Sequence, residues 1–168
     1  EKSYLISDEI SVKLSETENA QGIFAVFGIE EKTVDFKADG KYIALDNVQD
    51  PGNLGTILRT AEALGIDGII IGGGCDLYNP KVLRATMGAV FRVNTIRCSD
   101  AAEVLASLKA QNFKIYATSP SSSAKPITDA DFSGGGICVI GNEANGISDR
   151  VSELADDLIT IKMLGRAE

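Results

Sequence analysis

The sequence of 168 residues contains no histidine and no tryptophan, and only three cysteines. The lack of histidine excludes every His-based catalytic triad, and the lack of closely spaced cysteines excludes the usual zinc-binding patterns. Cys75, Cys98 and Cys138 are far apart and stand beside apolar neighbours, so we expect reduced and partly buried thiols. The sequence therefore predicts a site without a metal.

Long hydrophobic runs are absent as well, since no apolar stretch approaches the length of a membrane-spanning helix. The first residues, Glu-Lys-Ser-Tyr, do not have the pattern of a secretory signal. We therefore expect a cytoplasmic protein without a membrane partner. Hydrophobic residues make up 44% of the chain, which is enough for one sizeable core.

Positive charge is scarce, because 16 Lys and Arg residues stand against 24 Asp and Glu residues and leave a net charge of −8. This balance argues against a nucleic-acid partner, since binding to phosphates depends on Lys and Arg. A local basic patch could still supply the attraction. The candidates for such a patch are Arg59, Lys81, Arg84, Arg92 and Arg97.

Strand and helix patterns alternate from Lys41 onward, which predicts an α/β fold with a mostly parallel sheet and helices on both faces. Predicted strands cover residues 42–45, 68–71, 93–96, 114–118, 137–140 and 158–161. Predicted helices cover residues 53–64, 80–89 and 101–110, and a short helix follows Ser148. In the N-terminal part we expect a helix that starts near Ser7 and a buried strand over residues 22–27.

The stretch from Tyr42 to Gly65 reads as a strand, a polar turn and a helix start. Such a junction offers unpaired backbone N–H groups and the positive end of a helix dipole, and Asn53 and Arg59 stand on it. This arrangement favours an anionic ligand, although an ordinary strand-to-helix turn would have the same outline. Neither G-x-G-x-x-G nor the P-loop pattern occurs, which removes the main support for dinucleotide or nucleoside-triphosphate binding.

Three ordered motifs resemble the signatures of one enzyme family, the SpoU (TrmH-like) family of RNA 2′-O-ribose methyltransferases in the SPOUT superfamily. The first motif is formed by Asn47, Asp50-Pro51, Asn53, Gly55 and Arg59. The second is Ile140-Gly-Asn-Glu-Ala-Asn-Gly-Ile147, and the third is Ile161-Lys-Met-Leu-Gly-Arg-Ala-Glu168. The family usually has proline at the position of Lys162 and continues past the position of Glu168 into a Ser-Leu-Asn run.

The resemblance implies methyl transfer from S-adenosylmethionine to a ribose 2′-hydroxyl of structured RNA, with ribosomal RNA more expected than transfer RNA. It also implies a homodimer and a C-terminal trefoil knot, which we expect to be incomplete within these residues. The residues that it assigns to the cofactor are Thr118, Ser119, Gly141, Asn142, Ile161, Met163 and Gly165. The residues that it assigns to catalysis are Asn53, Arg59 and Glu143, and for RNA binding we add Lys81, Arg84 and Arg92 to Arg59.

The family arginine, Arg59 here, is regarded as the group that activates the hydroxyl. An arginine guanidinium keeps its proton at neutral pH, and removing that proton would cost about 7 kcal/mol. We therefore expect Arg59 to hold the ribose-phosphate and lower the pKa of the hydroxyl. We also expect Glu143 and Asn53 to fix the guanidinium in one orientation.

The resemblance further implies that residues 1–37 close an RNA-recognition domain and that residues 38–168 form the catalytic domain. An alternative is that residues 1–37 simply pack on the catalytic domain. Two other functions stay open at this point: a non-catalytic RNA-binding relative with the same fold, and a nucleotide-binding doubly wound enzyme of another class.

Overall fold

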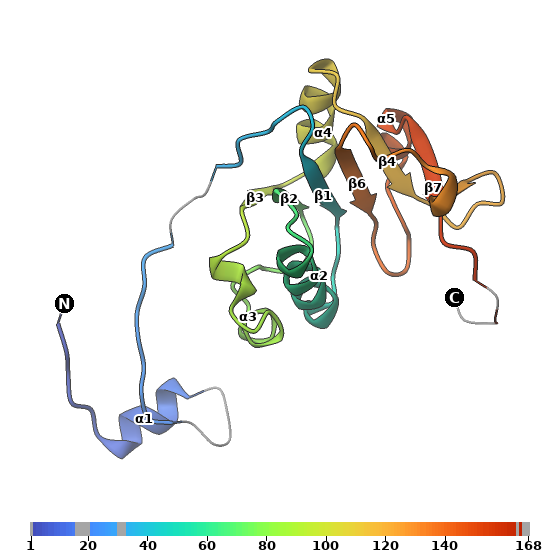
Figure 1. The fold of residues 1–168 in the computed structure, drawn as a ribbon. Coiled ribbons are helices and arrows are strands. Elements are labelled where there is room, and N and C mark those ends of the chain that lie inside the picture. The colour runs from blue at the N-terminus through green and yellow to red at the C-terminus, as the bar shows by residue number, and fades with distance from the viewer. Residues whose placement is uncertain (1, 16–20, 30–32, 164, 166–168) are drawn as a thin grey trace. The chain divides into compact units, whose positions relative to one another are not determined.

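The computed structural model describes residues 2–15, 21–29, 33–163 and 165. The chain divides into two compact units, Glu1–Glu31 and Lys32–Glu168, which we describe separately. The ribbon in Figure 1 shows both units.

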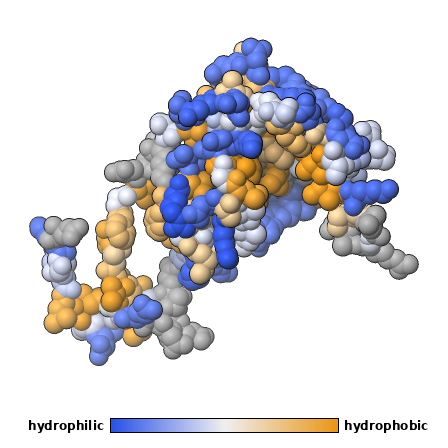
Figure 2. Space-filling model, viewed as in Figure 1, coloured by the Kyte–Doolittle hydropathy of each residue, from blue (hydrophilic) through white to orange (hydrophobic). Residues whose placement is uncertain are grey.

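Among its described residues, the first unit has one short helix, α1 (Asp8–Leu14), which begins where the sequence predicted it. The Ser7 hydroxyl caps the helix by accepting a hydrogen bond from the Ile10 N–H. No residue of α1 is buried. Figure 2 shows hydrophobic residues on the surface of this unit.

The prediction of a buried strand over residues 22–27 is wrong. In the described part of the chain these residues pair with no strand, and the side chains of Val26 and Phe27 are exposed. The hydrophobic pattern of this segment is that of a strand, but a strand also needs a neighbour for its backbone groups.

The second unit is built on a seven-stranded sheet in which every pair of neighbours is parallel. The order across the sheet is β3-β2-β1-β6-β4-β7-β5. The central strands are continuous apolar runs because both of their faces are covered. The strands are β1 (Lys41–Asp46), β2 (Gly68–Gly72), β3 (Thr95–Cys98), β4 (Ile115–Thr118), β5 (Lys125–Pro126), β6 (Gly136–Ile140) and β7 (Asp157–Thr160).

Helices cover both faces of this sheet, as the sequence predicted (Figure 1). On one face lie α2 (Pro51–Ala63), α3 (Pro80–Ala85) and the 3-10 helix η1 (Ala89–Phe91), whose apolar side chains form one half of the core. On the other face lie α4 (Ala101–Ala110) and α5 (Asp149–Leu154), which form the second half. A second 3-10 helix, η2 (Ile127–Asp129), follows β5.

The start of α2 differs from the prediction by two residues. The Asp50 side chain accepts a hydrogen bond from the Asn53 N–H at 2.8 Å, and Pro51 occupies the first helical position. Proline is tolerated there because it lacks only an N–H that has no partner within the helix. The predicted turn over residues 50–53 is therefore the first turn of the helix.

The predicted helix over residues 80–89 is too long, and the predicted strand over 93–96 is displaced by two residues. Helix α3 ends at Ala85 because Met87 and Gly88 both have positive φ, 49° and 85°. The chain then forms η1, and β3 begins at Thr95. Strand β5 was not predicted, since a two-residue strand in a Ser/Pro-rich segment has no detectable pattern.

Strands β1 and β6 define the place where the order of the sheet reverses. The chain runs from β1 to β2 and β3 on one side, then crosses to build β4, β6 and β7 on the other. Ligands of open parallel sheets bind at such a point, next to the carboxyl ends of the strands. The loops that follow β1 and β6 therefore form the first candidate site.

Candidate functional site

The carboxylate of Glu143 joins the loop after β6 to the loop after β1. Its Oε2 accepts a hydrogen bond from the Gln49 N–H, and its Oε1 accepts from the Asp50 N–H and the Asn53 Nδ2, all at 3.0 Å. These bonds, first of all that from Asn53, lower the pKa of Glu143 from its usual 4.5 to about 2. We call this arrangement the Glu143 clamp.

Two further hydrogen bonds connect the same two loops. The Asn142 side-chain amide donates to the Asn47 carbonyl at 2.9 Å, and the Ser148 N–H donates to the buried Asp46 carboxylate at 2.7 Å. Asn47 has a φ of 62°, a conformation that asparagine tolerates better than most residues. These bonds fix the loop over residues 141–148 to the segment that leads from β1 into α2.

Gly141 lies where that loop turns back against itself. The N–H groups of Asn142 and Gly146 donate to each other's carbonyls at 2.8 and 2.9 Å. A Cβ on Gly141 would stand 2.2 Å from the Gly146 carbonyl carbon and 2.3 Å from the Ile147 nitrogen. Both atoms belong to the backbone, so no other residue fits at position 141 without moving the loop.

Arg59 does not make the contacts that we expected from the sequence, and that prediction is wrong. Across the described part of the chain, the Arg59 side chain forms no hydrogen bond and no ion pair, and it is exposed. The oxygens of Glu143 are already occupied by other donors. Asn53 and Arg59 are six positions apart on α2, which turns their side chains roughly 120° away from each other.

Three of the residues that the resemblance assigns to the cofactor lie where neighbouring strands end. Thr118 ends β4, Gly141 follows β6, and Ile161 follows β7. These three strands are adjacent and parallel, so their carboxyl ends meet. Ser119 and Asn142 come next in these loops, and the Ser119 N–H donates to the Ile159 carbonyl at 2.9 Å. Met163 and Gly165 follow on the segment that leaves the sheet after β7, and a Cβ on Gly165 would meet no atom within 4 Å.

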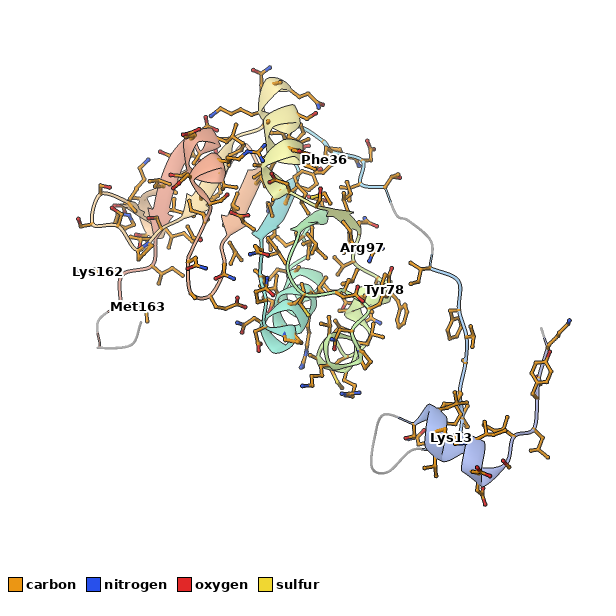
Figure 3. The ribbon with its side chains drawn as sticks, turned by 180° about the vertical axis from the view of Figure 1, so that it is seen from behind. Lys13, Phe36, Tyr78, Arg97, Lys162 and Met163 are labelled. Atoms are coloured by element: carbon orange, nitrogen blue, oxygen red, sulfur yellow. The ribbon has the colours of Figure 1, made fainter. Side chains whose placement is uncertain are left out.

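Apolar side chains are available at this edge. Ile161 and Met163 are 67% and 58% exposed. In Figure 3, Lys162 and Met163 lie on the segment that leaves the sheet after β7. A flat, partly apolar ligand such as an adenine can use such side chains together with nearby backbone N–H and C=O groups.

A hollow of about 310 Å³ lies between α2 and the ends of β1 and β6. Asn53, Gly141 and Glu143 of its lining were named as site residues from the sequence, but the apolar part, formed by Val48, Ile57 and Ile140, was missed. The contributions of the Gln49 and Asp50 N–H groups were also missed, because backbone donors leave no sequence pattern. The lining residues are Val48, Asn53, Thr56, Ile57, Ile140, Gly141 and Glu143.

The predicted basic residues fall into two groups. Arg92 donates to Glu62 through its Nε and Nη2, and Arg97 lies 3.5 Å from Asp76, with its guanidinium 5.1 Å from the Tyr78 ring (Figure 3). Their charges are therefore offset by neighbouring carboxylates. Lys81 and Arg84 are exposed on α3, and with Arg59 they are the predicted RNA-binding cations that have no carboxylate partner among the described residues.

Two features are missing from the residues that the structure describes. These residues contain no group of three or more His, Cys, Asp or Glu side chains that could hold a metal ion. They also contain no helix long and apolar enough to cross a membrane.

We predict that Glu143→Gln removes part of the pH dependence of stability. Because the pKa of Glu143 is lowered on folding, its stabilisation is fully present above pH 4.5 and is lost as the pH falls toward about 2. The variant should unfold at lower urea concentration than the wild type at pH 7, and this difference should shrink between pH 4.5 and 2. Glu153→Gln, at an exposed carboxylate on α5, is the control and should show no such convergence. A constant difference in unfolding urea concentration between pH 4.5 and 2 would contradict the Glu143 clamp.

An open parallel sheet covered by helices on both faces, with polar loops at the reversal point, defines an α/β protein that binds a small ligand at its strand ends. Comparison with protein families assigns the chain more narrowly. Residues 40–168 match the model of the SpoU rRNA Methylase family, and the chain belongs to this family.

Two kinds of relatives agree with this assignment. The 23S rRNA (guanosine(2553)-2′-O)-methyltransferase RlmP of Bacillus subtilis is 34% identical over 166 residues, which are 98% of this chain and 65% of that protein. The SpoU methyltransferase AviRb of Streptomyces viridochromogenes, solved in complex with AdoMet, has a TM-score of 0.73 and 30% identity, over 80% of this chain and 55% of that one. The AdoMet-bound rRNA methyltransferase of Sinorhizobium meliloti has a TM-score of 0.73 and 34% identity, over 79% and 51%. The chain thus spans between half and two thirds of the length of these relatives.

Proposed function

We propose that the chain carries the catalytic part of an enzyme that methylates a ribose 2′-hydroxyl of RNA. The observation that carries this proposal is the meeting of the ends of β6, β4 and β7 at one edge of the sheet, beside the helix that bears Arg59. Two relatives with similar sequences are named as 2′-O-methyltransferases of 23S ribosomal RNA. Two of the similar structures contain AdoMet.

The residues at this edge fit S-adenosylmethionine. The backbone packing at Gly141 leaves no room for a Cβ, so the loop presents its peptide groups without covering side chains. Thr118, Asn142 and Met163, with their neighbours in the three loops, would hold the cofactor through backbone groups and apolar contact. When bound there, the cofactor would supply the methyl group: its S–CH3 bond would break as the ribose oxygen bonds to the methyl carbon, the thioether S-adenosylhomocysteine would leave, and the hydroxyl proton would pass to water or an RNA phosphate oxygen.

Arg59 would act on the RNA side of the reaction. A free guanidinium can grip the phosphate and ribose oxygens of the acceptor nucleotide with two parallel N–H groups, which keeps the 2′-hydroxyl in place and lowers its pKa. Glu143 would act as a positioning residue, because a carboxylate with a pKa of about 2 does not accept a proton at neutral pH. Asn53 would work with Glu143 by fixing the start of α2.

The substrate that we propose is ribosomal RNA in preference to transfer RNA, because the relative from Bacillus subtilis is named for 23S rRNA. We place the enzyme in the cytoplasm, where that substrate occurs. The test is an in vitro assay with radiolabelled S-adenosylmethionine on separated ribosomal and transfer RNA, followed by mapping of the methylated position. Binding of RNA without methyl transfer would favour the non-catalytic relative, and absence of both activities would overturn the proposal.

We also propose that residues 1–37 belong with an RNA-recognition domain and residues 38–168 with the catalytic domain. Support comes from the first unit, where Leu5, Ile23 and Val26 are 85% or more exposed and therefore lack the cover that such side chains normally have. Hydrogen exchange of the full-length protein would test the assignment. Protection of residues 22–29 on a par with the sheet would support a packed partner for this segment.

A two-fold homodimer is the assembly that we propose, with apolar surface near the cofactor edge as its interface. Ile161 and Met163 are the exposed apolar side chains that such an interface would cover. We predict that light scattering of the full-length protein at micromolar concentration gives the mass of two chains. The mass of one chain at this concentration would contradict the prediction.

A further inference from the structure

One stripe of α2 runs along the segment between α3 and β3. Gly55, Arg59 and Glu62 are spaced by four and three residues, so they lie on the same side of the helix. At one end of the stripe a Cβ on Gly55 would be 2.3 Å from the Ala85 Cβ, and at the other end Glu62 is paired with Arg92. Arg59 stands between these contacts, so it lies alongside residues 85–92.

The middle of that segment exposes two large apolar side chains. Met87 and Phe91 are both 71% exposed. Met87 has a φ of 49°, a left-handed conformation that is costly for a residue with a side chain. Strain of this kind persists where the surrounding structure enforces it, and it is common at functional sites. Here the residue in this conformation is an exposed methionine.

Unpaired positive charge borders the same surface. Lys81 and Arg84 are exposed, three positions apart on one side of α3, and neither has a carboxylate partner among the described residues. Met87 comes two residues after the end of α3, and its N–H donates to the Arg84 carbonyl. The chain as a whole has a net charge of −8, so these cations without carboxylate partners make this part of the surface locally basic.

From this juxtaposition we propose that Lys81, Arg84, Met87 and Phe91 form an RNA-binding surface, the α3 platform, which holds single-stranded nucleotides next to the methylated one. The proposal rests on the proposed function. Unstacked bases bind aromatic and other apolar faces, and their phosphates bind Lys and Arg. The position of Arg59 beside the platform explains why bases bound there would flank the acceptor ribose.

Met87→Gly tests the platform without endangering the fold. Glycine adopts a positive φ at no steric cost, so the variant loses the side chain and should not be less stable. We expect the affinity of the full-length protein for a short single-stranded oligoribonucleotide to fall about fivefold or more, on the order of the stacking contribution of one base. Affinity for a duplex of equal length and for S-adenosylmethionine should stay within twofold.

Asn112→Gly is the matched control, because Asn112 also has positive φ, 67°, but follows α4 on the opposite face of the sheet. It should leave RNA affinity unchanged. Equal RNA affinities of the wild type and Met87→Gly would overturn the platform. Conversion of a dimer to a monomer by Met87→Gly would also overturn it and would assign this surface to a second copy of the chain.

The salt dependence of RNA affinity tests the basic residues of the platform. Arg84→Gln should reduce the slope of log affinity against log salt by about 0.7 for single-stranded RNA, the effect of one lost phosphate contact. Arg150→Gln on α5, which removes one arginine from the opposite face, should leave the slope unchanged. An unchanged slope for Arg84→Gln would overturn the phosphate contact.

These results separate the platform from the proposed function. If the wild type methylates RNA and Met87→Gly does so with equal affinity and rate, only the platform fails. If the wild type binds the oligoribonucleotide but transfers no methyl group, the binding comparison still decides on the platform while the proposed function fails. If the wild type binds no RNA, both fail.

Discussion

Replacing Arg59 by alanine is expected to lower the rate of RNA methylation by roughly a hundredfold or more, with the affinity for S-adenosylmethionine changed by no more than a few-fold. The reason is the position of the side chain. Arg59 is exposed on α2 and forms no ion pair with any described residue, so its guanidinium is available to the RNA and holds no part of the protein together. Single-turnover kinetics with saturating cofactor would measure the rate, and calorimetry the affinity.

Arg59→Lys should fail nearly as badly, because an ammonium group cannot reproduce a planar contact with two parallel N–H groups. Thr60→Ala, at the next exposed position of the same helix, is the control for local changes and should keep full activity. Full activity of the lysine variant would reduce the role of Arg59 to a generic positive charge. A large loss of cofactor affinity in Arg59→Ala would contradict this role, because it would show that Arg59 binds the cofactor and not the RNA.

Replacing Gly141 by valine is expected to abolish binding of S-adenosylmethionine, and Gly141→Ala should weaken it by roughly a hundredfold. Even the single methyl group of alanine would come within 2.5 Å of three backbone atoms, those of Gly146 and Ile147, and backbone cannot rotate away as a side chain can. The loop over residues 141–148 must therefore move, and with it the Asn142 peptide at the cofactor edge. The sheet should survive, because the collision lies beyond the end of β6.

Calorimetry would give the affinities, and circular dichroism would show whether the α/β fold persists. Gly134→Ala is the matched control, since a Cβ there meets no atom within 4 Å and the residue has no positive φ. Normal cofactor affinity in Gly141→Ala would remove this loop from the cofactor site. Complete unfolding of both Gly141 variants would show instead that the loop is needed for the fold.

The regular elements around the core could be predicted because their patterns are local. Asn79-Pro80 starts α3 as expected, since a capping side chain and a proline at the first position act within one turn. The end of α3 could not be predicted in the same way. Met87 is an ordinary helix residue by composition, and no local pattern marks its left-handed φ of 49°. The packing of Ala85 against Gly55 just before it is also hidden, because Gly55 lies far away in the sequence.

The motifs named residues for the candidate site but did not give the contacts that the structure shows among them. They named Asn53 and Glu143, which form a hydrogen bond in the structure. They did not reveal that two backbone N–H groups, of Gln49 and Asp50, would complete the shell of the Glu143 carboxylate. The sequence shows which side chains are polar. Which donors reach the Glu143 carboxylate depends on how the two loops are placed in three dimensions.

The Glu143 clamp also bears on the order in which the molecule folds. It joins Gln49 to a residue 94 positions later, and β1 pairs with β6 across a similar separation. Closing so long a loop costs chain entropy before any contact repays it, and contacts of this kind slow folding. During synthesis from the N-terminus, the start of α2 therefore cannot reach its final hydrogen bonding until residue 143 has left the ribosome. The strands β1, β2 and β3 can pair earlier, so the binding edge is assembled after the half of the sheet that supports it.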